Sequence, residues 1–239
     1  MVIPIVLVVI LSLISYLILH RFQGYVKAIS DSYRSRFEGI VKGIIAALEL
    51  KDPYTRGHSE RVAYYALTLA QRLQKYNEDE LEAFYYSCLL HDVGKVSLPD
   101  SILTKPGKLT PEEYEIVKQH PVVGSEAIKD IEKLPNSIDV IRYHHERWDG
   151  QGYPDGLEGE EIPLLARVVA IADAFDAMTS DRSYRKAISP EEAYNRILEA
   201  EGTQFDPELV QVFKEVYPIW VKLIDSYKQK KAMMEEKQL

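Results

Sequence analysis

The chain has 239 residues, 46% of them hydrophobic and 28% charged, with a formal net charge of −8. This length accommodates one well-cored domain with an appendage. The negative charge excludes a non-specific binder of long nucleic acids, because such a protein needs a basic face to displace counterions. The lone cysteine, Cys88, excludes an intrachain disulfide and a cysteine-based zinc finger.

Residues 2–19 form an uncharged, almost wholly apolar run, close to the shortest helix that spans a bilayer. No basic residue precedes the run and no small-residue cleavage site follows it, which disfavours a secretory signal peptide. Basic residues follow it, beginning with Arg21 and Lys27. The pattern predicts a single-pass anchor over residues 1–20 in the inner (cytoplasmic) membrane, with the remainder in the cytoplasm. A signal peptide and a buried or interfacial helix are the alternatives.

Apolar residues then recur every three or four positions between residues 22 and 48, which predicts one helix with an apolar stripe. The stripe is either a homodimer seam or a face packed on the domain, since its heptads are imperfect. We therefore divide the chain into an anchor (1–20), a juxtamembrane helix (21–43), a catalytic domain (44–229) and a polar tail (230–239).

The remaining sequence has strong helix-start signals. Three pairs have capping-box spacing, namely Asn77 with Glu80, Thr110 with Glu113, and Ser189 with Glu192. Pro111 and Pro190 stand at first helical positions, and a last helix opens at residues 206–207. No segment alternates with period two. An all-α fold is predicted, with loops at about 97–109 and 147–163.

Histidines and acids form the pattern with the most chemical content: His58, His91, Asp92, His120, His144, His145 and Asp173. Taken singly, a histidine at a helix end is more often a cap than a ligand. However, the helices that precede Asp92 and surround Asp173 are apolar, and a buried, unpaired carboxylate is costly. Asp176 lies one turn beyond Asp173 on the same face. These acids therefore need buried cationic partners, and we predict a metal centre.

The donor types indicate which metals the centre holds. Imidazole and carboxylate without thiolate favour Zn, Mn or Fe. The set exceeds what a single tetrahedral zinc uses, so we expect at least two divalent ions. Paired ions suit phosphodiester hydrolysis, because one activates water and both neutralise charge on phosphorus. The spacing alone does not name the substrate.

Several separated motifs also resemble a known family. The series His58, His91-Asp92 and Asp173 resembles the HD superfamily of metal-dependent phosphohydrolases, and residues 144–154, HHERWDGQGYP, resemble the signature of its HD-GYP branch. Residues 105–109, 120–121 and 181–186 match in kind and order, so the resemblance covers roughly residues 44–217. It implies an HD-type helical bundle around a metal centre, with cyclic di-GMP as substrate and either linear pGpG or GMP as the final product.

The resemblance also implies roles for individual residues. The ligands would be the seven histidines and acids above, with Asp92 bridging two ions. Lys95 would contact the scissile phosphate, and Tyr153 would line the guanine side. Arg182 and Arg185 would hold substrate phosphate. The alternatives are that Lys95 only neutralises the acids and that the two arginines are ordinary surface residues.

Two positions depart from the family pattern. Ser183 stands where proline is frequent, and Tyr54 stands where some members carry a metal-binding glutamate. Because a phenol is a poor ligand at neutral pH, we expect two ions rather than three. Two other functions stay open: a phosphohydrolase for another cyclic dinucleotide or nucleotide, and a non-catalytic module that binds the messenger or a partner protein.

Overall fold

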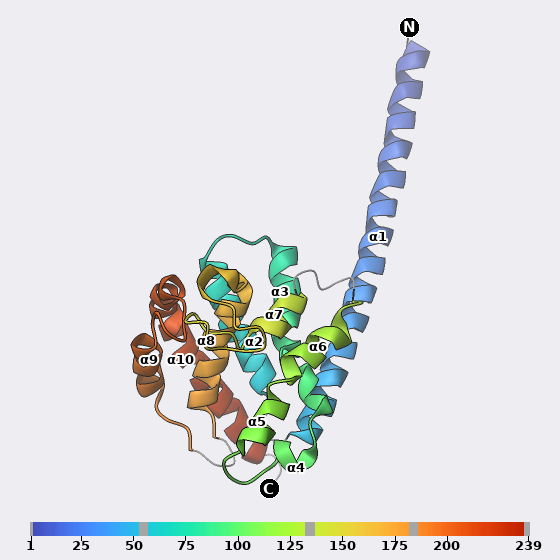
Figure 1. The fold of residues 1–239 in the computed structure, drawn as a ribbon. Helices are drawn as coiled ribbons and strands as arrows, with labels where there is room; N and C mark the ends of the chain where they lie inside the picture. The colour runs from blue at the N-terminus through green and yellow to red at the C-terminus, as the bar shows by residue number, and fades with distance from the viewer. Residues whose placement is uncertain (1, 53–56, 132–136, 182–185, 237–239) are drawn as a thin grey trace. The chain divides into compact units, whose positions relative to one another are not determined.

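The computed structural model describes residues 2–52, 57–131, 137–181 and 186–236, which are helical for most of their length (Figure 1). The chain divides into two compact units, Met1–Gly43 and Ile44–Leu239. The described residues contain no β-strand, only the isolated bridges Asp149–Glu158 and Glu201–Phe205. This confirms the all-α prediction.

The first helix, α1 (Val2–Lys51), is continuous through the predicted anchor and juxtamembrane segments. Among the described residues, none of the helices combines the length and apolarity needed to cross a membrane. The predicted anchor over residues 1–20, and with it the single-pass placement in the inner membrane, is therefore wrong. The apolar run had only about the minimum length for a span, and the same helix continues into charged residues such as Arg21 and Lys27.

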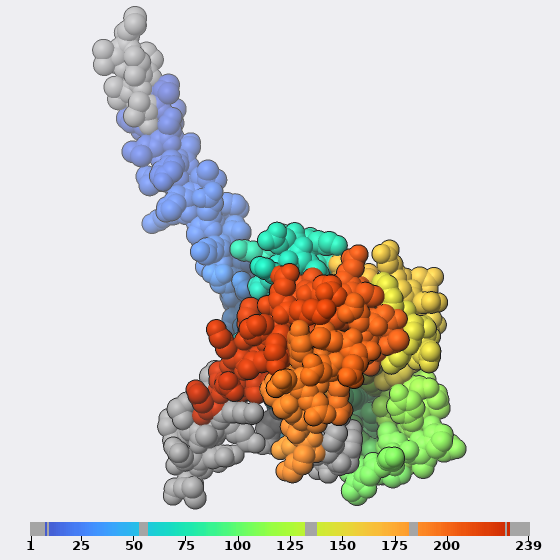
Figure 2. Space-filling view, turned by 90° about the vertical axis from the view of Figure 1, so that its left-hand side faces the viewer, coloured from blue at the N-terminus to red at the C-terminus, as the bar shows by residue number. Residues whose placement is uncertain are grey.

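The second unit contains the remaining helices. They are α2 (His58–Arg72), α3 (Glu78–Leu90), the 3-10 helix η2 (Val93–Ser97), α4 (Asp100–Leu103), α5 (Pro111–Val117), α6 (His120–Ile128), α7 (Ser137–Tyr143), the 3-10 helix η3 (Gly159–Glu161), α8 (Leu164–Thr179), α9 (Pro190–Glu199) and α10 (Pro207–Glu236). Helix α2 packs against α3 and α8, and α6 packs against α7 and η2. Helices α9 and α10, coloured orange to red, form much of the face of this unit seen in Figure 2.

Local sequence signals explain where these helices begin. Asn77 and Thr110 each accept a hydrogen bond from the third helical residue, and the glutamate there closes the capping box, as predicted. Ser189 accepts from the backbone N–H of Glu192, but the reciprocal bond is absent, so that box is only half formed. The predicted loop at 97–109 contains the short helix α4, and the loop at 147–163 contains η3.

An aromatic core fixes the helices behind the site. Trp220 on α10 is fully buried, and its ring centroid lies 4.8 Å from Tyr65 on α2, 5.0 Å from Phe175 on α8 and 5.1 Å from Phe213 on α10. The Trp220 indole N–H donates to the Thr68 hydroxyl at 2.7 Å. Large aromatic rings contribute strongly to burial, and the indole bond fixes their register. Helices α2, α8 and α10 therefore form a rigid support for the residues at their ends.

Candidate metal centre

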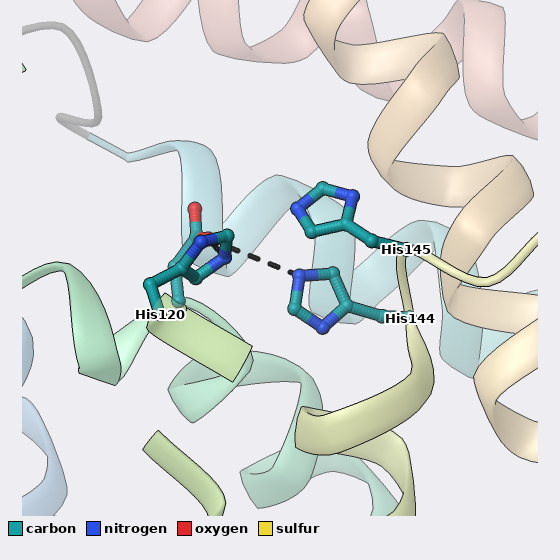
Figure 3. A group of neighbouring side chains, drawn as sticks. His120, His144 and His145 are labelled. Carbon is teal, nitrogen blue, oxygen red and sulfur yellow. Dashed lines mark ion pairs between the residues drawn. The ribbon is translucent and has the colours of Figure 1, made fainter. Parts of the chain in front are cut away.

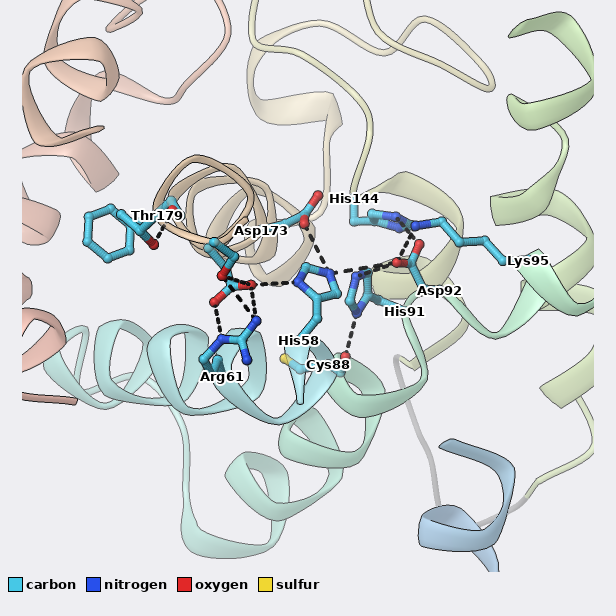
Figure 4. Close-up of polar contacts among 12 residues, drawn as sticks. His58, Arg61, Cys88, His91, Asp92, Lys95, His144, Asp173 and Thr179 are labelled. Carbon is cyan, nitrogen blue, oxygen red and sulfur yellow. Dashed lines mark hydrogen bonds and ion pairs between the residues drawn. The ribbon is translucent and has the colours of Figure 1, made fainter. Parts of the chain in front are cut away.

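Two groups of metal-ligand side chains lie side by side and share one residue. The first consists of His58, His91 and Asp92, and the second consists of Asp92, His120, His144 and His145. Within each group the ligand atoms lie within 4.8 Å of one another. Figure 3 shows His120, His144 and His145 converging, and Figure 4 shows Asp92 beside His91, His144 and Lys95. The shared carboxylate makes this a candidate centre for paired ions.

The ligands converge because helix ends meet at one point. His58 is the first residue of α2, and His120 is the first residue of α6. His91 follows the last residue of α3, and His144 follows the last residue of α7. Helix ends give side chains a fixed direction without interrupting the backbone bonds within the helix. The architecture can therefore place many polar groups in one buried volume.

The two oxygens of Asp92 face different histidines. Its Oδ2 atom lies 3.3 Å from Nε2 of His91 and 3.7 Å from Nε2 of His58. Its Oδ1 atom lies 3.2 Å from Nε2 of His120 and 4.0 Å from Nε2 of His144. A carboxylate that offers one oxygen to each group has the geometry of a bridging ligand.

Three histidines of the centre are held by backbone carbonyls. Nδ1 of His91, His120 and His144 lies 2.6, 2.7 and 2.8 Å from a carbonyl oxygen three residues earlier in the chain. A carbonyl only accepts, so each Nδ1 carries the hydrogen, and in the neutral ring the Nε2 lone pair faces Asp92. These Nε2 atoms and Asp92 Oδ1 are buried without a hydrogen-bond partner. A divalent cation between them would satisfy nitrogens and carboxylate together, so the residues fit a metal.

The pKa shifts of the histidines and of Asp92 also indicate that this buried carboxylate requires positive charge beside it. Burial lowers the pKa of His144 to about 3 and holds the pKa of His145 well below its usual range, so both rings are neutral, as ligands must be. Burial also lowers the pKa of His91, but the Asp92 carboxylate outweighs burial and the net shift is upward. Burial raises the pKa of Asp92, but Lys95 and His91 outweigh it and hold that pKa well below its usual range.

Asp173 on α8 lies outside both groups but next to the first. Its Oδ1 atom is 3.4 Å from Nε2 of His58. The structure therefore brings six of the seven predicted ligands into the two groups and places the seventh beside them.

Asp176 and Arg61 support His58 from behind. The sequence predicts Asp176 only as an acid that needs a buried partner, and it gives no role to Arg61. Asp176 Oδ2 lies 2.7 Å from Nδ1 of His58, and Arg61 donates to both Asp176 oxygens, at 2.7 and 3.0 Å (Figure 4). Burial raises the pKa of Asp176, but His58 and Arg61 outweigh it and lower the pKa to about 2. A carboxylate on the second nitrogen of a histidine orients that ring toward a metal. The available sequence signal was the one-turn spacing of Asp176 from Asp173 and of Arg61 from His58.

Lys95 lies on η2, immediately beyond the centre. Its Nζ atom donates to Asp92 Oδ2 at 2.5 Å, so in this structure it neutralises the shared carboxylate. The preceding helix α3 ends at Leu90, and a 3-10 turn carries Lys95 back over Asp92. Gly94 allows this turn to approach α6, because a Cβ there would lie 1.9 Å from the His120 carbonyl oxygen. The glycine thus brings Asp92 and His120 together.

The loop after His145 places Tyr153 over the centre. The Tyr153 ring stacks on His145, with centroids 4.8 Å apart. Buried Glu146 fixes the loop, since its Oε1 atom accepts from the backbone N–H of Asp155 at 2.8 Å and of Gly156 at 3.0 Å. Burial raises the pKa of Glu146. Four other residues named from the sequence lie outside the described part of the chain: Tyr54, Arg182, Ser183 and Arg185.

Comparison with known proteins agrees with this architecture. The sequence model of the HD domain family matches residues 42–209. The chain belongs to the HD domain family. It is similar to a cyclic di-GMP phosphodiesterase of Thermotoga maritima, with 41% identity over 167 residues that cover 69% of this chain and 45% of the relative. It is also similar to the 3'3'-cGAMP-specific phosphodiesterase 2 of Vibrio cholerae, with 37% identity over 184 residues, 76% of this chain and 35% of the relative.

Among solved structures, a cyclic GMP-AMP specific phosphodiesterase of V. cholerae has the same fold, with a TM-score of 0.58 and 20% identity over 76% of this chain and 49% of that one. This confirms the HD-type helical bundle. The chain spans less than half the length of the curated relatives described here. The family is metal-dependent, and the clustered histidines and acids of this chain fit that requirement.

Proposed function

We propose that this chain is a metal-dependent phosphodiesterase that hydrolyses cyclic di-GMP to linear pGpG. The observation that carries the proposal is the pair of ligand groups that share Asp92. Relatives at 41% identity that act on cyclic di-GMP, including the Thermotoga maritima enzyme, support the substrate. Paired divalent ions supply Lewis acidity and lower the pKa of an attacking water.

The chain's own residues divide the work of binding and orienting the substrate. Asp92 would be shared by two ions, one also held by His58, His91 and Asp173 and the other by His120, His144 and His145. Lys95, which bonds Asp92 in this structure, would contact the scissile phosphate with its ammonium group and stabilise charge on the phosphoryl group. Tyr153 offers a ring face to guanine beside His145. Arg182 and Arg185 would hold substrate phosphate.

We assign two ions of the Fe, Mn or Zn type to each chain. The seven ligands, with Asp92 shared, give about four protein donors to each ion and leave open positions for water and phosphate. A third ion would need a further donor, and Tyr54 is a poor one. The reaction then favours the first cleavage, to pGpG, over the second, to GMP.

Within this proposal, residues 44–229 form the catalytic domain, residues 21–43 a preceding helical segment and residues 230–239 a polar tail. Of the apolar stripe over residues 22–48, the exposed part, residues 22–40, serves as a homodimer seam, because its apolar positions recur at helical spacing. Leu48, at the other end of the stripe, is buried. The oligomeric state of the chain, measured by light scattering with and without residues 1–43, tests that part separately.

A second substrate has specific support, because several relatives are 3'3'-cGAMP-specific phosphodiesterases, at 35–38% identity. The deciding experiment loads the purified chain with Mn²⁺ or Fe²⁺, measures bound metal, and compares kcat/KM for cyclic di-GMP and 3'3'-cGAMP. A higher value for cyclic di-GMP, abolished in Asp92→Ala, supports the proposal. Preference for 3'3'-cGAMP would replace the substrate. Metal binding with messenger affinity but no hydrolysis would indicate a non-catalytic binding module.

A further inference from the structure

The last turn of α1 is bonded to two segments that carry residues of the metal centre. Lys51, the final residue of α1, donates through Nζ to the carbonyl oxygen of Val96 at 2.6 Å and to that of Leu98 at 2.7 Å. Its side chain is three-quarters buried, and the Asp100 carboxylate lies 3.6 Å away. These carbonyls lie at and just beyond the end of η2, so one ammonium group fixes the segment that bears Lys95.

Glu49, two residues earlier on α1, holds the other segment. Its Oε1 atom accepts from the backbone N–H of Gly57 at 2.7 Å. Gly57 caps α2 with φ 68°, a left-handed conformation that glycine adopts without strain, and His58 follows it directly. The bond to Glu49 therefore fixes the backbone from which the His58 side chain projects toward Asp92.

The end of α1 is itself anchored within the second unit. Ile45 and Leu48 are buried on the same stretch of helix, whereas Leu50 is 82% exposed. A side chain on such an anchored turn positions its partners better than one on a mobile loop, since the rigid helix limits its freedom. Glu49 is not in either ligand group, and a lysine ammonium is not a metal ligand. The contacts of Glu49 and Lys51 therefore act on the centre through the segments that carry His58 and Lys95.

We propose that Glu49 and Lys51 are positioning residues for phosphodiester hydrolysis. Both lie on the last turn of α1, and by holding the segments that carry His58 and Lys95 they fix the distance between these two side chains. The inference rests on the proposed function. A displacement of about 1 Å in a catalytic group can reduce turnover about a hundredfold. A residue that only stabilised the fold, without positioning His58 or Lys95, would change stability and leave turnover unchanged. The helix end thus determines whether Lys95 reaches a phosphate that is held beside His58.

The first test compares Lys51→Met with Lys129→Met in the full chain. Lys129 is a matched control, because it makes an ordinary exposed ion pair with Glu126. In Lys51→Met we expect kcat for cyclic di-GMP to fall by about tenfold or more, with KM changed by less than about threefold and bound Mn²⁺ unchanged. In Lys129→Met all three should match the unaltered chain. Equal kcat in the two variants would overturn the proposal.

The second test uses Glu49→Ala and Glu49→Gln. Glutamine keeps an oxygen that can accept from Gly57, so it should retain most of the kcat that alanine loses. Equal loss in the two variants would mean that charge or folding, and not this hydrogen bond, accounts for the effect. This pair keeps the proposal falsifiable if Lys51→Met folds poorly.

Amide hydrogen exchange separates failure of this inference from failure of the proposed function, because it needs no substrate. Exchange at the Gly57 N–H should accelerate by about tenfold in Glu49→Ala, and exchange across η2 should accelerate similarly in Lys51→Met. If the unaltered chain hydrolyses no cyclic dinucleotide, the proposed function fails, and faster exchange still shows that the turn holds both segments. Unchanged exchange in both variants would overturn the positioning role.

Discussion

Asp92 and Asp176 are both buried carboxylates in contact with histidine, yet their surroundings differ in one decisive respect. Around Asp92, the Nε2 atoms of His91, His120 and His144 are buried without hydrogen-bond partners. Around Asp176, the Nδ1 of His58 and the guanidinium of Arg61 both donate to the oxygens. Lys95 bonds only the Oδ2 atom of Asp92, so Oδ1 and the three imidazole nitrogens remain unsatisfied and suit metal ions. Both oxygens of Asp176 already accept from cationic or N–H donors, which suits a support. Burial alone therefore does not identify a ligand; the state of the facing nitrogens does.

The largest effect should come from Asp92→Ala, which breaks the shared ligand. Both ion sites lose a donor and the imidazoles lose their counter-charge, so we expect bound metal to fall sharply and hydrolysis of cyclic di-GMP to disappear. Elemental analysis and product chromatography measure the two outcomes. A full complement of metal in this variant would show that Asp92 is not a bridging ligand.

Lys95→Ala should affect turnover and leave the ions in place, because Lys95 contacts Asp92 without belonging to either ligand group. We expect kcat to fall by about a hundredfold or more, as for other groups that stabilise transition-state charge. Steady-state kinetics with parallel metal analysis check this. Loss of metal equal to that of Asp92→Ala would assign Lys95 to the maintenance of the centre.

Asp176→Asn should weaken metal binding without abolishing it, since the His58 ring loses an anionic support but keeps its place in the chain. Loss of such a support typically lowers metal affinity about 10- to 100-fold. Titration with Mn²⁺, followed by electron paramagnetic resonance, should show one weakened site. An unaltered titration would mean that Arg61 and Asp176 serve folding alone.

The smallest effect on the metal centre should come from Asp206→Asn. This variant removes a buried carboxylate that is paired with an arginine, as Asp176 is, but that does not contact a histidine of the centre. Asp206 is also buried and accepts from an arginine, Arg167, at 2.6 Å, but its other oxygen caps α10 and contacts no histidine. We expect a loss of about 1–3 kcal/mol in the free energy of unfolding, with metal affinity unchanged. Thermal denaturation and Mn²⁺ titration check both. If Asp206→Asn lowered metal affinity as much as Asp176→Asn, the effect of Asp176 could not be attributed to its contact with His58.

The spacing of residues close together in the sequence was sufficient to predict where several helices begin. The starts of α3, α5 and α9 follow from side chains that cap a backbone three residues away. Acids in apolar helices require cationic partners, which predicted a metal centre, whereas the set of seven ligands came from the resemblance to the HD superfamily. Six of the seven meet in the two groups. The prediction of a membrane anchor was wrong, although the prediction of a helix over the same residues was right. An apolar run of borderline length indicates a helix, but its length alone does not establish that the helix lies in a membrane.

By itself, the sequence determined the helical class, the helix starts and the donor types of the centre, since these depend on periodicity, capping and side-chain chemistry. Only the tertiary structure decided which oxygen of Asp92 faces which histidine, that Asp176 lies against His58 118 positions away, and that Lys51 holds the end of η2. The physical reason is that such contacts depend on the relative placement of helix ends. That placement follows from the packing of the whole core, including Trp220 and Gly94, and is not encoded in any one segment.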